Sequence, residues 1–241
     1  MKQLMQWASR PHMKLLGVGT AATALLGLTL LAGCGGGGGG SFNGGGSPSA
    51  SGLPSAKATA DQVAQGRALV VSLSCADCHN RGKDDPTDPN WLAGYIGPAA
   101  GGPPGSFQIG PFETYAANLT PDVTTGLGGV TDRQVYNALK YGLDPGVTPD
   151  VTITSTTPGQ GNFPTTPHYL APPMPWPSFR HLSDSDLWAI VAYIKHGIKP
   201  VANAVPDSQG PPDFWASSYT DAAVGPANLP AYPAGNEQFS P

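Results

Sequence analysis

The stretch Cys75-Ala76-Asp77-Cys78-His79 decides how the rest of this chain is interpreted. Two thiols at this spacing can add to the two vinyl groups of one porphyrin. The adjoining histidine then lies against the ring face with a nitrogen on the iron, and CxxCH is the attachment signature of c-type haem. We therefore expect one covalent haem c, attached through Cys75 and Cys78, with His79 as the proximal iron ligand.

Two other uses of the cysteine pair make demands that the sequence does not meet. A zinc ribbon needs a second CxxC, whereas Cys34 is the only other cysteine in the chain. A thioredoxin-like redox pair needs a βαβ context, and no such pattern surrounds the motif. Chance occurrence of the pattern stays open, but haem attachment is the interpretation that it favours.

The composition argues against several broad classes of protein. Gly and Pro supply 33 and 27 of the 241 residues, hydrophobic residues make up 39% and charged residues 12%. A uniformly packed two-domain enzyme does not fit this composition, and so little charge excludes a disordered polyelectrolyte. The net charge is −4 and the cations are scattered, so no nucleic-acid partner is expected. One modest domain with long Pro/Gly-rich loops and tails fits best.

The amino terminus is typical of an export signal. Residues 1–14 are basic, and residues 15–31 form an uncharged stretch of mainly Leu, Ala and Gly. The sequence Leu31-Ala32-Gly33-Cys34 resembles the lipobox of bacterial lipoproteins. This resemblance implies that residues 1–33 are a signal peptide and that Cys34 carries the lipid, on the extracytoplasmic (periplasmic) face of the cell envelope.

The alternative is a transmembrane anchor that persists over residues 15–33, because about 19 residues can just span a bilayer. In either case residues 34–60 are rich in Gly and Ser and predict a flexible tether between the membrane and the folded part.

Apolar spacing predicts three helices in the folded part. The first begins near Asp61 as its cap, and the second covers residues 132–141, with Thr131 as its N-cap and Gly142 at its end. The third runs over residues 184–196.

The segments between these helices, residues 80–117 and 142–178, are dense in Pro, Gly and Thr. No alternating apolar segment is longer than residues 151–154, so we expect an all-α fold with long irregular loops and no sheet. Three short helices bury little apolar surface, and a large cofactor is expected to fill the centre.

Met174 is the only methionine that remains after the predicted signal peptide. It lies in the Pro-rich segment 171–177, which can hold a thioether at fixed geometry, although a lone methionine is usually a core filler. His168 is the main rival for the distal iron position, and His181 and His196 are weaker candidates. We expect Met174 to be the distal iron ligand.

Residues 61–206 resemble bacterial class I (mono-haem) cytochromes c. After CxxCH, residues 118–122 (Asn-Leu-Thr-Pro-Asp) and 126–128 are similar to the loop before the middle helix in membrane-associated cytochrome c domains, such as those serving periplasmic dehydrogenases. Residues 173–180, followed by 182–184, resemble the distal-ligand loop of the same family.

The resemblance implies a cytochrome c fold in which the first and last helices cross. A glycine of one helix then lies under an aromatic residue of the other, and Gly66 with Tyr193 or Trp188 matches that contact. Arg180 either pairs with a haem propionate or is a solvated loop cation. The tail, residues 207–241, has no counterpart in the family, and its aromatic residues suggest a strap on the domain or a partner-docking segment.

Two axial ligands leave no open position on the iron, which favours electron transfer over catalysis. We therefore expect a membrane-tethered mono-haem electron carrier that is not an enzyme. Its expected partners are redox proteins of the cell envelope, namely dehydrogenases, oxidases or other cytochromes. The alternatives are a haem-bearing subunit of a membrane dehydrogenase or oxidase complex, and an open-site haem peroxidase or sensor.

Overall fold

The computed structural model describes residues 58–97 and 105–238. The predicted signal peptide, the lipidation site Cys34 and residues 34–57 of the predicted tether lie outside this part of the chain. No helix among the described residues is long and apolar enough to cross a membrane.

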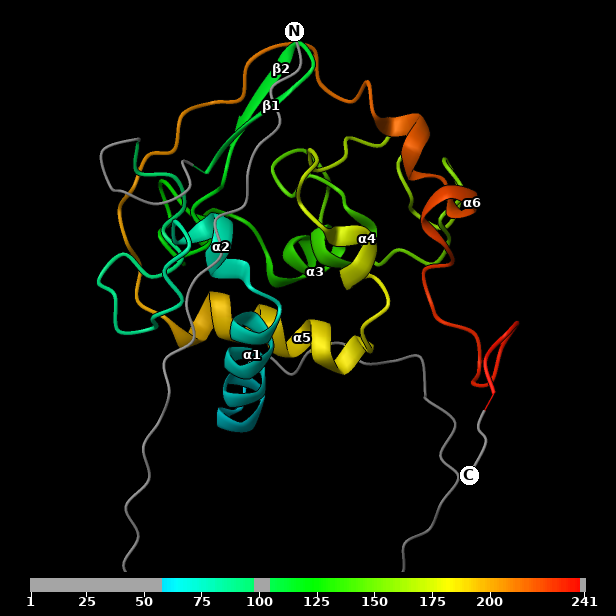
Figure 1. Cartoon of the computed structure of the whole chain (residues 1–241), viewed down its shortest axis with the longest axis horizontal. Helices are drawn as coiled ribbons and strands as arrows, with labels where there is room; N and C mark the ends of the chain where they lie inside the picture. Colours follow the sequence, from blue (N-terminus) through cyan, green and yellow to red (C-terminus); the bar gives the residue numbers. More distant parts are fainter. Residues whose placement is uncertain (1–57, 98–104, 239–241) are drawn as a thin grey trace, which may run out of the picture. The chain divides into compact units, whose positions relative to one another are not determined.

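Helices are the main regular structure of the described residues, and one small sheet accompanies them (Figure 1). The elements, in chain order, are α1 (Ala60–Ser72), α2 (Cys75–His79), β1 (Ser106–Ile109), β2 (Phe112–Tyr115), η2 (Leu127–Gly129), α3 (Asp132–Tyr141), α4 (Trp176–Phe179), α5 (Asp184–Ala192), η3 (Tyr193–Gly197), η4 (Ala216–Tyr219) and α6 (Asp221–Val224).

The helix ends follow their capping residues. Helix α3 has the predicted bounds because Thr131 and Gln134 form a capping box and Gly142 adopts a left-handed conformation, with φ of 69°. The predicted cap of α1 was wrong by two residues: Thr59, and not Asp61, accepts a hydrogen bond from the backbone of Gln62. The third predicted helix is α5 followed by η3, a π-type turn that ends at Gly197.

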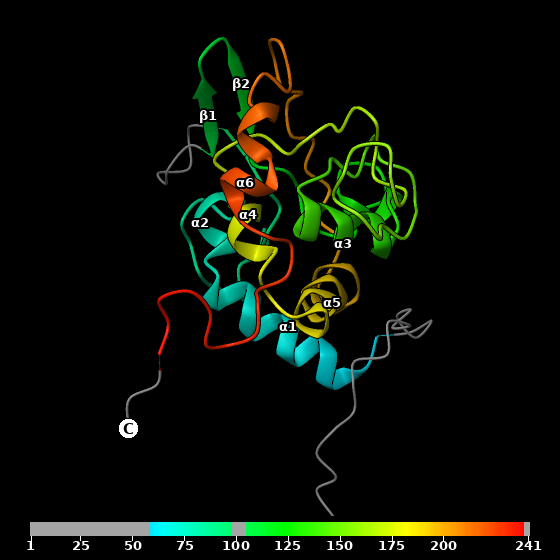
Figure 2. The same cartoon turned by 90° about the vertical axis from the view of Figure 1, so that its right-hand side faces the viewer.

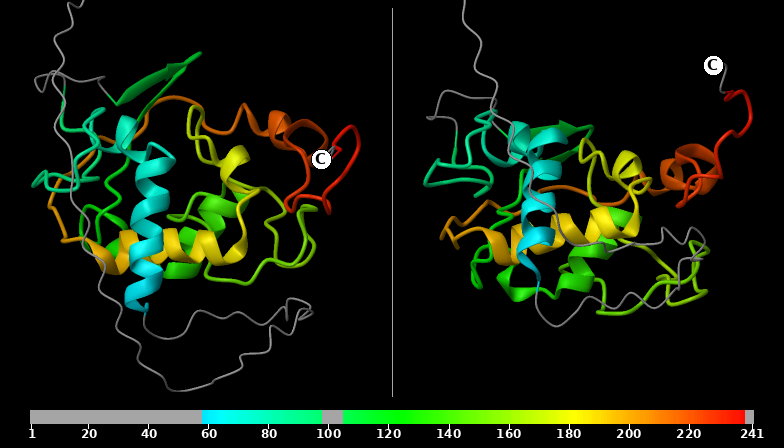
Figure 3. Two further views of the ribbon diagram at one scale, coloured as in Figure 1. Left: turned by 60° about the horizontal axis from the view of Figure 1, so that its bottom comes forward. Right: turned by 90° about the horizontal axis from the view of Figure 1, so that it is seen from below.

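Helices α1 and α5 cross at Gly66 (Figure 3). A Cβ atom on Gly66 would overlap the carbonyl oxygen of Ala189 and lie 2.8 Å from the Cβ atom of Tyr193. Only glycine therefore permits this approach of the two backbones. Trp188, the other aromatic residue considered for this contact, instead stacks on Tyr136 of α3.

The expectation of a chain without a sheet was wrong. Strands β1 and β2 pair antiparallel, and Glu113 of β2 also exchanges two backbone hydrogen bonds of 2.8 Å with Gln209 of the tail. The ring of Phe112 packs edge-on against Trp215, also in the tail, at 4.9 Å. Figure 2 shows the tail running beside this hairpin. Each strand is only four residues long, so its alternation is too short to stand out from the surrounding loop residues, and periodicity did not reveal the strands.

One hydrophobic cluster joins α1, α3 and α5. Its buried members include Val70, Val135, Leu139, Leu187, Ile190 and Val191. A smaller separate cluster of Leu143, Ile153 and Phe163 lies within the segment that follows α3.

Candidate haem-binding site

Helix α2 places the two thiols and the histidine of the CxxCH motif. It begins after Ser74, whose left-handed backbone (φ of 55°) turns the chain sharply at the end of α1. Cys75 and Cys78 are three residues apart on this short helix and so lie on one face. That placement gives two thiols a common direction, as attachment to one flat ring requires.

His79 is held in the form that binds a metal. Its ring nitrogen Nδ1 lies 2.7 Å from the carbonyl oxygen of Ala117. A carbonyl can only accept, so Nδ1 carries the hydrogen and Nε2 keeps its lone pair. Burial lowers the pKa of His79, which keeps the imidazole neutral at neutral pH. A neutral imidazole whose second nitrogen is fixed by a carbonyl is the usual arrangement of a metal-ligating histidine.

The carbonyl of Ala117 is itself positioned by a partly buried polar network. Asn118 donates from Nδ2 to the carbonyl oxygen of Val201 at 2.8 Å. Asn203 donates from Nδ2 to the carbonyl oxygens of Ala93 at 2.7 Å and Tyr95 at 2.9 Å. These bonds tie the loop before Ala117 and the loop after it to the segment that follows η3. The sequence marked residue 118 through the family motif but gave no signal for Ala117 or Asn203.

The two thiols are neutral at neutral pH. Burial is the main cause that raises the pKa of Cys75 to about 11, and burial together with the charge of Asp77 raises the pKa of Cys78. Redox-active CxxC pairs have a thiol pKa that is lowered, not raised. This electrostatic environment does not support the thioredoxin-like alternative.

Met174 lies partly buried against the main hydrophobic cluster, which Cys75 also contacts. Its backbone N–H donates to the carbonyl oxygen of Ala171 at 3.1 Å, and α4 begins two residues later. Met174 and Cys75 thus pack against the same hydrophobic cluster, although they are far apart in the sequence.

The rival histidines make other contacts. Nδ1 of His168 lies 2.7 Å from a carboxylate oxygen of Asp213, and Nε2 of His196 lies 2.7 Å from one of Asp132. The side chains of both histidines are about half exposed. His181 lies beside Gly225 of the tail. Met174 is thus the candidate distal ligand that packs against the cluster shared with the CxxCH motif.

Arg180 is not a solvated loop cation, and that interpretation was wrong. Its side chain is only 2% exposed, and Nη2 donates to Oδ1 of Asp221 at 2.8 Å. Its guanidinium also lies 5.6 Å from the centre of the Trp176 ring. The pairing of Arg180 with a haem propionate stays a prediction.

The residues present fit a covalent haem. Two thiols share a helix face, a neutral imidazole keeps a lone pair on Nε2, and a thioether packs against the hydrophobic cluster that Cys75 contacts. In residues 58–97 and 105–238, no three His, Cys, Asp or Glu side chains are grouped as a site for a protein-bound metal ion alone would require.

No protein-family model matches the chain. It is 32% identical over 150 residues to the gluconate 2-dehydrogenase cytochrome c subunit of Pantoea cypripedii, a match that covers 62% of this chain and 26% of that protein. It is 30% identical over 159 residues to the fructose dehydrogenase cytochrome subunit of Gluconobacter japonicus, covering 66% and 26%.

A third relative is the cytochrome c subunit of the alcohol dehydrogenase (quinone) of Gluconacetobacter polyoxogenes. The identity is 34% over 105 residues, which cover 43% of this chain and 17% of that protein. The chain therefore spans about a quarter, or less, of the length of the curated relatives that it matches. Together with the geometry of the CxxCH motif, these relatives support a c-type cytochrome whose cofactor is haem c.

Proposed function

We propose that this chain is a membrane-tethered c-type cytochrome with one haem, which carries single electrons between extracytoplasmic redox partners. The observation that carries the proposal is the buried, neutral His79, whose Nδ1 is engaged by the Ala117 carbonyl while Nε2 has no hydrogen-bond partner among the described residues. Its position directly after two thiols on one helix face adds the means of covalent attachment.

Each residue has a separate task in this proposal. Cys75 and Cys78 would hold the porphyrin through thioether bonds, and the Ala117 carbonyl orients His79 so that Nε2 could bind the iron. Met174 would hold the iron as a second protein ligand. Haem, when bound, provides a one-electron couple between ferrous and ferric iron. With His79 and Met174 both ligating, the iron would offer no site for a substrate, and a thioether ligand would favour a higher potential.

The proposed partner is a dehydrogenase, because the relatives are cytochrome subunits of gluconate, fructose and alcohol dehydrogenases. A lipid on Cys34 and the Gly-rich segment that follows it would keep the domain close to a membrane-bound partner, which raises the local concentration of the carrier. Two or more acyl chains are enough for stable anchoring.

Absorption spectra of the purified protein, oxidised and reduced, test the haem and its ligation together. We expect the spectrum of haem c, a weak red charge-transfer band in the ferric protein, and slow or no binding of carbon monoxide to the ferrous protein. Rapid binding of carbon monoxide would instead indicate an open iron position and favour a peroxidase or a sensor.

A pull-down from solubilised membranes tests the partner. A tagged full-length chain should retain a dehydrogenase subunit, and membranes from cells with the untagged chain provide the control. Recovery of the cytochrome alone would contradict a stable complex with a dehydrogenase. A carrier that diffuses between its partners would still agree with that result.

A further inference from the structure

We infer that the carboxyl-terminal tail clamps the loop that carries Met174 and so stabilises the bond between its sulfur and the haem iron. The described part of the tail is residues 207–238, and residues 168–180 are here called the distal loop. Asp213 and Asp221 are the positioning residues. The inference rests on the proposed role of Met174 as the distal ligand.

The first attachment is at the start of the distal loop. Asp213 accepts from the backbone N–H of Tyr169 at 3.0 Å through Oδ1, and its Oδ2 lies 2.7 Å from Nδ1 of His168. Asp213 itself has a φ of 60°, a conformation that costs energy in a residue other than glycine. Such backbone strain persists where surrounding contacts hold the residue in place. Asp213 therefore contacts two consecutive residues of the distal loop, and its own backbone conformation is constrained.

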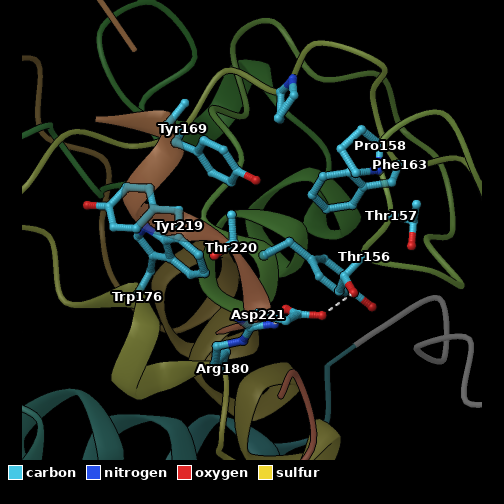
Figure 4. A pocket seen from close by; sticks show the side chains of 13 residues that line it. Thr156, Thr157, Pro158, Phe163, Tyr169, Trp176, Arg180, Tyr219, Thr220 and Asp221 are labelled. Atoms are coloured by element: carbon cyan, nitrogen blue, oxygen red, sulfur yellow. Dashed lines mark hydrogen bonds and ion pairs between the residues drawn. The ribbon is translucent and has the colours of Figure 1, made fainter. Parts of the chain in front are cut away.

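The second attachment is at the end of the distal loop. Arg180 is nearly fully buried and donates from Nη2 to Oδ1 of Asp221 at 2.8 Å, while Oδ2 of Asp221 accepts from Thr156 at 2.6 Å (Figure 4). Burial opposes ionisation of Asp221, but the hydrogen bonds from Thr156 and Arg180 hold the pKa of its carboxyl below the usual range. A buried guanidinium without its carboxylate would be left uncompensated, so this pair resists separation.

Tyr219 of the tail contacts the distal loop between these two attachments. Its ring packs edge-on against Trp176 at 4.8 Å and against Tyr169 at 5.3 Å, and those two rings stack on each other at 5.8 Å. Trp176 is 1% exposed and lies two residues after Met174. Aromatic pairs in these geometries contribute beyond the area they bury.

The ion pairs carry much of this attachment because the packing is incomplete. Tail residues 216 and 219–221, together with Tyr169, Trp176 and Arg180 of the distal loop, border a cavity of about 320 Å³ (Figure 4). Atoms that line a cavity lack dispersion contacts on one side. The loop around Met174 is therefore held at its two ends by Asp213 and Asp221 and in its middle by Tyr219.

Isosteric variants of the two acids test the clamp in the haem-loaded, full-length protein. Asp213→Asn and Asp221→Asn remove one negative charge each, and Asp221→Glu restores the carboxylate. Asp207→Asn is the matched control, since Asp207 is an exposed tail acid with no hydrogen bond or ion pair among the described residues. The readouts are the rate of cyanide binding to the ferric iron, the red charge-transfer band, and hydrogen–deuterium exchange of the backbone amides in residues 168–180.

We expect Asp213→Asn and Asp221→Asn each to speed cyanide binding about tenfold, since each weakens a charged hydrogen bond to the distal loop. Amide exchange in residues 168–180 should rise with it, exchange in α1 should not, and Asp221→Glu should recover most of the wild-type rate. Wild-type rates and exchange in both Asn variants would overturn the clamp.

The same experiment separates the clamp from the proposed ligation. If the wild-type ferric protein has no red charge-transfer band, the role of Met174 fails, and the exchange data still report whether the tail holds the loop. If Asp221→Asn does not fold, Asp213→Asn decides the question, because that aspartate pairs with a half-exposed histidine and not with the buried arginine.

Discussion

The surroundings of His79, as well as its residue type, mark it as the proposed iron ligand. His79 and His196 are both imidazoles with a hydrogen-bond partner at 2.7 Å. The partner of His79 is a carbonyl in a buried site, whereas the partner of His196 is the carboxylate of Asp132 near the surface. Burial favours the neutral form of His79, and a neutral imidazole is the form that coordinates iron.

Replacement of Met174 tests ligation at this scale. Met174→Ala should remove the red charge-transfer band, lower the reduction potential and open the iron to carbon monoxide or cyanide, because no second axial ligand is left. Met174→His should close the site again at a lower potential, since imidazole favours ferric iron more than a thioether does. Absorption spectra and redox titration measure both effects.

His168→Ala is the control for that experiment, because His168 is the main rival ligand and contacts Asp213 in the structure. It should leave the band and the potential unchanged, because Asp213 still accepts the hydrogen bond from the backbone N–H of Tyr169 when the His168 side chain is removed. If Met174→Ala keeps the band and the potential while His168→Ala alters them, His168 is the ligand. The proposal of an electron carrier then loses its main support.

At the scale of elements, the crossing of α1 and α5 places α2 and therefore the CxxCH motif. Helix α1 leads into α2 through only two residues, so any displacement of α1 on α5 moves Cys75 and His79 with it. Lys195 links η3 to the segment before α3, because its ammonium group donates to the carbonyl oxygens of Leu127 and Val130.

Gly66→Ala should lower the free energy of unfolding by about 1–3 kcal/mol, because a Cβ atom at this position overlaps the backbone of Ala189 and forces the helices apart. Denaturant unfolding of the haem-loaded protein measures the change. Gly146→Ala is the control, since its added Cβ atom would meet only the end of the Asp144 side chain, at 3.2 Å. Equal stability of the two variants would contradict the tight crossing.

At the scale of the whole molecule, the fold and the cofactor are expected to depend on each other. The described helices are short, and the two hydrophobic clusters are separate. Small cores of this kind bury too little surface to offset the conformational entropy of long loops.

Cys75→Ser combined with Cys78→Ser should abolish covalent haem staining on a denaturing gel, and the apo chain should be largely unfolded. Circular dichroism and thermal unfolding measure the second effect. A cooperative unfolding transition in the apo variant would show that the helices suffice without the porphyrin.

Cys34→Ser tests the anchor. The variant should keep its haem but carry no lipid and leave the membrane fraction, because the thiol at the end of the lipobox-like sequence is the proposed acylation site. Labelling with a radioactive fatty acid, followed by fractionation, measures both outcomes. A labelled Cys34→Ser protein would contradict the assignment.

The sequence by itself determined the features whose signals are local. The CxxCH motif named three candidate residues, the Pro-rich segment named Met174, and the capping pair of Thr131 and Gln134 marked the start of α3. Each of these depends on residues within a few positions of one another, so spacing alone is sufficient to read them.

Only the tertiary structure decided which distant groups complete these features. The acceptor for His79 is a backbone carbonyl, which any residue type could provide, and the hairpin is paired with Gln209 of the tail. The partner of Arg180 is Asp221, and the buried guanidinium of Arg180 lies over the ring of Trp176. Contacts between segments far apart in the chain depend on how the whole backbone folds. Periodicity and motifs describe only neighbouring residues, so they do not predict such contacts.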